Sequence, residues 1–94
     1  MDKFVVIDTE TTWSDKVMSI GAVIADAYDM RPIETKYYIL NPEYMAGGMY
    51  SSALGHKRAG KPIICSREEA MADLVNTCSG HNITGLFAYN ALFD

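Results

Sequence analysis

The stretch "VVIDTETTW", from Val5 to Trp13, decides how the whole sequence is interpreted. Its first part completes a short apolar, β-branched run from Lys3 to Asp8, a composition typical of a strand buried on both faces. Asp8 and Glu10 follow at the end of this strand with one residue between them. In an extended chain they point to the same face, where two carboxylates repel unless a cation lies between them or one stays protonated.

This acidic pair has two interpretations. Mg²⁺ and Mn²⁺ are hard cations that prefer oxygen ligands, so the pair could form part of a site for either metal. Alternatively, Asp8 and Glu10 could simply be the solvated end of a strand, because a D-x-E pattern is common by chance.

Three further segments have the composition of strands, and one has the pattern of a helix. The strands are predicted at Val17–Asp26, Ile33–Leu40 and Ile83–Tyr89, and short connections make the first three strands of the chain an antiparallel meander. The helix should begin after Ser66, which has capping-box spacing with Glu69, and end at Gly80. Its apolar face would consist of Ala70, Met71, Leu74, Val75 and Cys78.

The order β-β-β-α-β predicts an α/β fold with a mixed sheet. The strand after the helical crossover should lie parallel to an earlier strand, through a right-handed connection. The segment between the third strand and the helix, Asn41–Pro62, is irregular and rich in glycine. A loop of this length in a small domain is usually functional or partly helical.

Length and composition describe one small globular domain. The chain has 94 residues, of which 49% are hydrophobic and 21% charged, and its net charge is −4. This balance excludes a disordered chain and argues against binding of nucleic acid through a broad basic surface, while metal ions could still supply positive charge. Cys65 and Cys78, with no signal peptide, suggest free thiols and a cytoplasmic location, and no apolar run is long enough to span a membrane.

Two other groups of residues are candidate sites. His56, His81, Cys65 and Cys78 could be imagined as zinc ligands, but they lack the paired spacing of structural zinc sites. We expect Cys78 in the core and both histidines on the surface. The cluster His56–Lys61 could touch a phosphate backbone, although a few exposed basic residues are usually just solvated.

Asp94, the last residue, strengthens the metal interpretation. A right-handed crossover could place the strand Ile83–Tyr89 beside the first strand, so that both end at the edge where α/β folds bind their ligands. Three carboxylates could then meet there. Asp94 could equally cap a helix, and the two roles are compatible.

With these residues the chain resembles the DEDD (DnaQ-like) 3′–5′ exonucleases of the polymerase III epsilon type. The first motif of that family is an apolar strand followed by D-x-E-T-T-G, and "VVIDTETTW" is similar to it. The second motif ends in N-x-x-F-D, usually after His, and here Tyr89 precedes "NALFD". The segments "SIGAVIAD" and "YYILNPE" look like the second and third strands of the family. The resemblance therefore covers nearly the whole chain.

The resemblance implies a ribonuclease H-like fold and a two-metal hydrolysis of phosphodiester bonds. Asp8, Glu10 and Asp94 would be three of the four catalytic acids that hold two Mg²⁺ or Mn²⁺ ions. Thr11 would contact the terminal nucleotide, and Asn90 and Phe93 would shape the substrate cleft. The implied substrate is the 3′ end of single-stranded DNA or RNA, and a DNA polymerase is a possible partner.

Three departures from the family pattern matter. Trp13 stands where the family has Gly, and it could change the loop or stack on a base. Tyr89 replaces the usual His, which we expect to be minor. The third motif, with the fourth acid and a His or Tyr base, has no counterpart after Asp94.

Residues 1–94 are therefore interpreted as the N-terminal part of one exonuclease domain, truncated before its last strand and helices. We expect this piece to be nearly inactive by itself and to self-associate through an uncovered sheet face. Two alternatives stay open. One is a non-catalytic module with the same fold that binds nucleic acid or a polymerase, and the other is an accidental match in an unrelated α/β domain.

Overall fold

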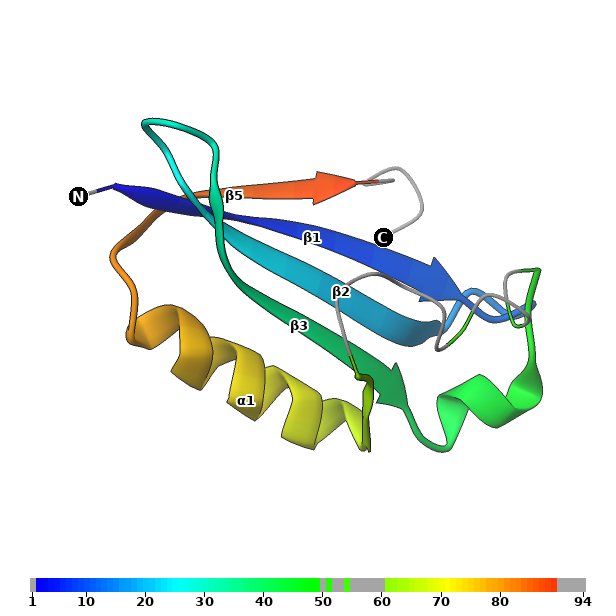
Figure 1. Cartoon of the computed structure of the whole chain (residues 1–94). Coiled ribbons are helices and arrows are strands. Elements are labelled where there is room, and N and C mark those ends of the chain that lie inside the picture. Colours follow the sequence, from blue (N-terminus) through cyan, green and yellow to red (C-terminus); the bar gives the residue numbers. More distant parts are fainter. Residues whose placement is uncertain (1, 50, 52–53, 55–60, 90–94) are drawn as a thin grey trace.

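The computed structural model describes residues 2–49, 51, 54 and 61–89, and within them it shows an α/β fold with a five-stranded mixed sheet and one α-helix (Figure 1). The elements in chain order are β1 (Lys3–Thr11), β2 (Val17–Asp26), β3 (Pro32–Leu40), the 3-10 helix η1 (Glu43–Ala46), β4 (Ile63–Cys65), α1 (Arg67–Ser79) and β5 (Ile83–Tyr89). No helix in the described ranges has both the length and the apolar character that crossing a membrane requires.

The strand order across the sheet is β4-β3-β2-β1-β5. Strands β1, β2 and β3 form the predicted antiparallel meander. Strand β5 returns after α1 to pair with β1 in parallel, as predicted from the helical crossover. The sequence-based expectation of a mixed sheet is confirmed.

The described part of the segment between β3 and α1 contains two elements. Its helical turn, η1, fits the expectation that this loop is partly helical. The short strand β4, which pairs in parallel with the end of β3, was not predicted. The consecutive β-branched residues Ile63 and Ile64 are the signal that could have revealed it.

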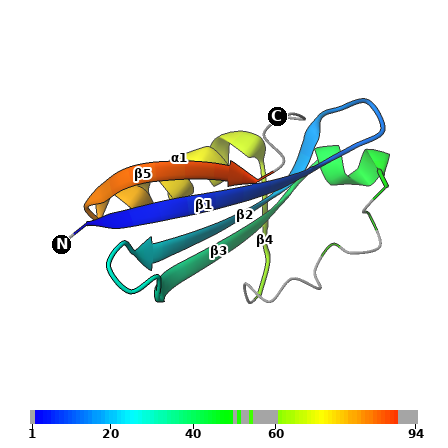
Figure 2. The same cartoon turned by 90° about the horizontal axis from the view of Figure 1, so that it is seen from above.

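Helix α1 begins with the predicted capping box. The Ser66 side chain accepts a hydrogen bond from the Glu69 backbone N–H at 3.1 Å, and the Glu69 carboxylate accepts one from the Ser66 N–H at 2.9 Å. The helix ends at Ser79, before Gly80. Figure 2 shows the helix on one side of the sheet.

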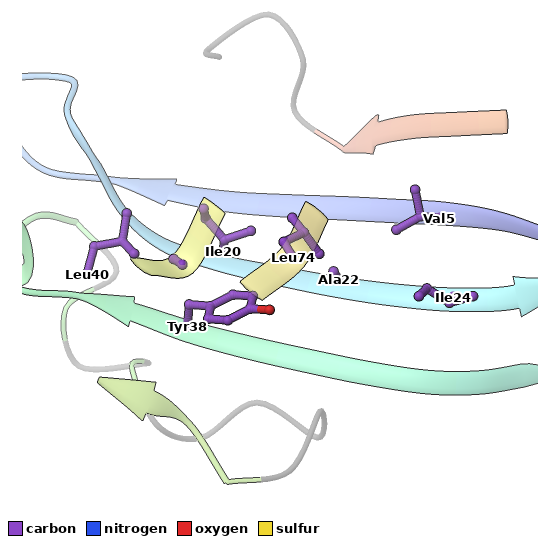
Figure 3. Packing of buried hydrophobic residues seen from close by; sticks show 8 residues of the cluster. Val5, Ile20, Ala22, Ile24, Tyr38, Leu40 and Leu74 are labelled. Carbon is purple, nitrogen blue, oxygen red and sulfur yellow. The ribbon is translucent and has the colours of Figure 1, made fainter. Parts of the chain in front are cut away.

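The main core lies between α1 and the sheet (Figure 3). Its buried members are Val5, Ile20, Ala22, Ile24, Tyr38, Leu40, Ala70 and Leu74, with Cys78 packed against them. The predicted core position of Cys78 is therefore confirmed. Only part of the predicted helix face is covered, because Met71 is 46% exposed and Val75 is 59% exposed.

A hydrogen-bonded group ties the helix to β3. The Tyr38 hydroxyl donates to the Asp73 carboxylate at 2.6 Å, and the Lys36 ammonium lies 3.4 Å from the same oxygen. Tyr38 itself is fully buried, and burial together with its bond to Asp73 raises the pKa of its hydroxyl. The group fixes the position of α1 on the strand.

Part of the sheet face opposite α1 is buried. The sequence-based expectation that this face is uncovered is therefore corrected. Ala25, Tyr37 and Ile39 point away from α1, because their neighbours Ile24, Tyr38 and Leu40 belong to the core against it, yet all three are buried. On the edge strand β5, Leu86 is 64% exposed and Phe87 is 59% exposed.

Candidate functional site

Asp8 and Glu10 share the face of the sheet opposite α1. Val5 packs in the core against the helix. Because side chains alternate along β1, Asp8 and Glu10 point away from the helix. On that face Asp8 pairs with Gly21, and Glu10 pairs with Ser19, both on β2. The prediction that the two acids lie on one face agrees with this register.

Glu10 is held by a hydrogen bond from the neighbouring strand. Its side chain is buried, and its Oε1 accepts a hydrogen bond from the Ser19 hydroxyl at 3.2 Å. Ser19 is itself 1% exposed. A buried carboxylate with an oriented oxygen is a suitable hard ligand for a divalent cation.

The end of β5 lies beside the acidic pair. Because β5 is parallel to β1, both strands end on the same side of the sheet. The last residue of β5, Tyr89, pairs with Asp8. The chain therefore leaves β5 next to Asp8. The predicted third acid, Asp94, and the predicted cleft residues Asn90 and Phe93 lie outside the described residues.

The turn after the acids is built by Thr12. The β1–β2 register shifts between Glu10 and Thr11, so that Thr11, the predicted nucleotide contact, pairs with Val17. The buried Thr12 hydroxyl then accepts hydrogen bonds from the backbone N–H of Ser14 at 3.3 Å and of Lys16 at 3.2 Å. These bonds fix the short turn that follows Thr11.

The loop after η1 closes against this turn. The Trp13 backbone N–H donates to the Gly47 carbonyl at 3.1 Å. A Cβ atom at Gly48 would collide with the Thr11 carbonyl oxygen and would lie 3.0 Å from the Thr12 Cα, so only glycine allows this approach. The Trp13 side chain remains 71% exposed.

Three residues of this arrangement were not singled out from the sequence: Ser19, Thr12 and Gly48. Ser19 could have been found, because a five-residue connection between two antiparallel strands places it near Glu10. Thr12 could also have been found, because Thr and Ser hydroxyls often bond to the backbone two residues further on in turns. No local pattern indicates that position 48 must be glycine. The need for glycine arises from Thr11 and Thr12, which are more than thirty residues away in the sequence.

Within residues 2–49, 51, 54 and 61–89, no three His, Cys, Asp or Glu side chains are placed to hold a metal ion. The Cys65 and Cys78 thiols are free, and burial raises the pKa of each. His56 lies outside the described residues.

His81 corrects a prediction. It was expected on the surface, yet its side chain is 16% exposed, and its Nε2 lies 2.8 Å from Glu34 Oε1 on β3. This contact ties the connection between α1 and β5 to the beginning of β3. His81 therefore has a structural role.

An apolar hollow of about 430 Å³ lies on the opposite face from the acids. It is lined mainly by side chains of α1, β1 and β5, among them Ile7, Leu74, Val75 and Leu86. Such a lining does not suit a phosphate, so the hollow is not the candidate site.

The candidate site is thus a pair of carboxylates near the carboxyl-terminal end of β1. The turn after β1 follows it, and the loop that contains Gly47 and Gly48 packs against this turn. Comparison of the chain with models of protein families, with curated proteins and with solved structures finds no match.

Proposed function

We propose that this chain has a ribonuclease H-like fold and the activity of a DEDD 3′–5′ exonuclease, which hydrolyses the terminal phosphodiester bond of single-stranded DNA or RNA. The observation that carries the proposal is that the strand with the first motif and the strand that precedes the second motif are neighbours in the sheet. The D-x-E strand β1 and the strand β5 that leads into N-x-x-F-D are parallel neighbours, paired at Asp8 and Tyr89.

The strand order supports the fold assignment. A meander of three strands followed by a helix and a strand beside β1 is the arrangement that the sequence resemblance implies. The short β4 extends this sheet beyond β3 and leaves the order of the other strands unchanged.

Each residue of the site then has a defined task. Asp8 and Glu10 would hold divalent metal ions, which when bound activate water and stabilise the leaving 3′ oxygen. Ser19 orients the Glu10 carboxylate. Thr11, at the end of β1, would hold the terminal nucleotide. Asp94, Asn90 and Phe93 would complete the site, as the resemblance of the second motif implies.

The first test is metal binding by the 94-residue chain. Mn²⁺ titration in a calorimeter should show binding that is lost in Asp8→Asn. A matched control is Asp29→Asn, because Asp29 lies in the β2–β3 turn at the other end of the sheet. Equal binding by both variants would contradict the assignment of the acids.

The second test is cleavage, for which full activity would need the fourth acid and the base of the family's third motif, neither of which is matched within residues 1–94. Loss of a 3′ label from single-stranded DNA or RNA with Mn²⁺, abolished by EDTA and by Asp8→Asn, is the expected result for the longest natural form of the chain. The 94-residue chain should show little or no cleavage. Metal and nucleic-acid binding without cleavage in every form would favour the non-catalytic module instead.

A further inference from the structure

We infer that Gly48 is a positioning residue for Glu10, because its loop clamps a β-bulge beside the hydrogen bond between Glu10 and Ser19. This inference rests on the proposed function, in which Glu10 holds a metal ion. It gives the candidate site a support from outside the hairpin, since Gly48 lies after η1 whereas Glu10 is on β1 and Ser19 on β2. Groups that hold a metal ligand in place change metal affinity without touching the metal.

The bulge lies directly beside the acid and its partner. Glu10 pairs with Ser19 across the hairpin. The next residue on β1 pairs with Val17, so Met18 is an extra residue on β2. A bulge bends its strand, increases the local twist and changes the direction of the side chains near it. The direction of the Ser19 hydroxyl toward the Glu10 carboxylate therefore depends on the geometry of this bulge.

Gly48 packs against both strands at the bulge. A Cβ atom at this position would collide with the Thr11 carbonyl oxygen on β1 and would lie 3.3 Å from the Met18 Cε on β2. Thr11 directly follows Glu10, and Met18 directly precedes Ser19. Met18 is also fully buried, so its surroundings are closely packed. The Gly48 backbone thus contacts the chain neighbours of both partners in the hydrogen bond.

Hydrogen bonds hold the loop in this position. The Gly48 N–H donates to the Ser51 hydroxyl at 2.7 Å, and the Ser51 N–H donates to the Gly48 carbonyl at 3.2 Å. The neighbouring Gly47 carbonyl accepts the bond from the Trp13 N–H at 3.1 Å, which attaches the loop to the turn after β1. The bulge is therefore enclosed by a bonded loop, and a shift of the bulge requires the loop to move.

The NMR signal of the Glu10 carboxyl carbon tests the positioning role without any metal. In the 94-residue chain at neutral pH, Ser19→Ala gives the signal of a Glu10 carboxylate without its serine partner. Gly48→Ala should move the Glu10 signal toward that value, and Gly80→Ala should leave it unchanged. Gly80 is the matched control, because the nearest atom to a Cβ there would be the Thr77 carbonyl oxygen at 3.5 Å. A folded Gly48→Ala with an unmoved Glu10 signal would overturn the inference.

Calorimetric titration with Mn²⁺, on variants that circular dichroism shows to be folded, measures the effect on the metal site. Gly48→Ala should bind Mn²⁺ about tenfold more weakly than the natural chain. Ser51→Ala is a second variant, because it loosens the loop at Gly48 without adding atoms, and it should weaken binding by a smaller factor. Ser79→Ala is its matched control, since the Ser79 hydroxyl donates to the backbone of its own helix.

The outcomes separate this inference from the proposed function. If Asp8→Asn abolishes Mn²⁺ binding while Gly48→Ala and Ser51→Ala bind Mn²⁺ like the natural chain and keep its Glu10 signal, the positioning role is wrong and the metal site stands. If the Glu10 signal moves in Gly48→Ala but Asp8→Asn binds Mn²⁺ as well as the natural chain, Gly48 positions Glu10 and the proposed function is wrong.

Discussion

The Ser19 hydroxyl donates a hydrogen bond of 3.2 Å to the Glu10 carboxylate, from one strand of a hairpin to the other. Both side chains are buried. The bond fixes one oxygen of a proposed metal ligand before any metal binds.

Ser19→Ala should therefore weaken Mn²⁺ binding. Removal of a partner that orients a metal ligand typically costs 10- to 100-fold in affinity, so we expect about tenfold here. Calorimetric titration measures it, with Ser79→Ala as the control, since Ser79 donates only to the backbone of its own helix. An unchanged Mn²⁺ affinity in Ser19→Ala, together with a loss in Asp8→Asn, would show that Glu10 needs no such support.

Gly48→Ala should destabilise the loop that closes on the turn after β1. The added methyl group meets backbone atoms of Thr11 and Thr12, which cannot rotate away as a side chain would. We expect a loss of about 1–3 kcal/mol in the free energy of unfolding, measured by urea denaturation. Gly21→Ala is the control, because there the nearest atom to the new Cβ would be the Asp8 carbonyl oxygen at 3.8 Å.

Tyr38→Phe tests the attachment of α1 to β3. The substitution removes the hydroxyl that donates to Asp73 at 2.6 Å but keeps the buried ring. Hydrogen bonds to charged groups contribute about 1.5–3 kcal/mol, and partial exposure of Asp73 places the expected loss near the lower end. Tyr28→Phe, at an exposed position, should change the unfolding free energy by less than about 0.5 kcal/mol.

The same pair predicts how stability depends on pH. The hydrogen bond from Tyr38, helped by Lys36, lowers the pKa of Asp73 below its ordinary value of 3.8. A carboxyl group with a lower pKa in the folded chain stabilises the fold above its unfolded pKa, and this contribution disappears as the pH falls through the folded pKa. The unfolding free energy should therefore decrease below about pH 4, and less steeply in Tyr38→Phe.

At alkaline pH the dependence is reversed, and the stability of the fold decreases as the pH rises. Burial and the Asp73 carboxylate raise the pKa of the Tyr38 hydroxyl, so its contribution is complete below the unfolded pKa of about 10 and decreases above it. Urea denaturation from pH 7 to 11 should show a larger decrease in the natural chain than in Tyr38→Phe, where the raised pKa values of the Cys65 and Cys78 thiols still cause part of it. A parallel decrease in both proteins would mean that other groups cause it.

Self-association should occur through the edge strand β5. This strand contains no charged residue or proline, and Leu86 and Phe87 are exposed on it. Such an edge offers unpaired backbone groups and apolar surface to a second copy. Light scattering after size exclusion should show a dimer or larger species for the 94-residue chain, and Leu86→Lys should reduce it while Met30→Lys should not. A stable monomer would contradict this prediction.

The meander and the position of β5 were predictable because they follow from local composition and from the rules of parallel crossovers. The strand β4 was missed because three residues are too few for an alternating pattern to emerge. His81 was misjudged because its partner Glu34 is distant in sequence, so no local spacing predicts the contact. The placement of Asp8 and Glu10 on one face could be predicted from the two-residue period of a strand alone. The need for glycine at position 48 could not, because it depends on how the loop packs against the turn after β1.

The pairing of β1 with both β2 and β5 has a consequence for the order in which the site is assembled. Glu10 meets Ser19 within a local hairpin, which closes with little loss of chain entropy. Asp8 meets Tyr89 only after a connection of about eighty residues has been closed, a contact of high sequence separation that forms slowly. A nascent chain would thus orient Glu10 early and add the β5 side of the candidate site last.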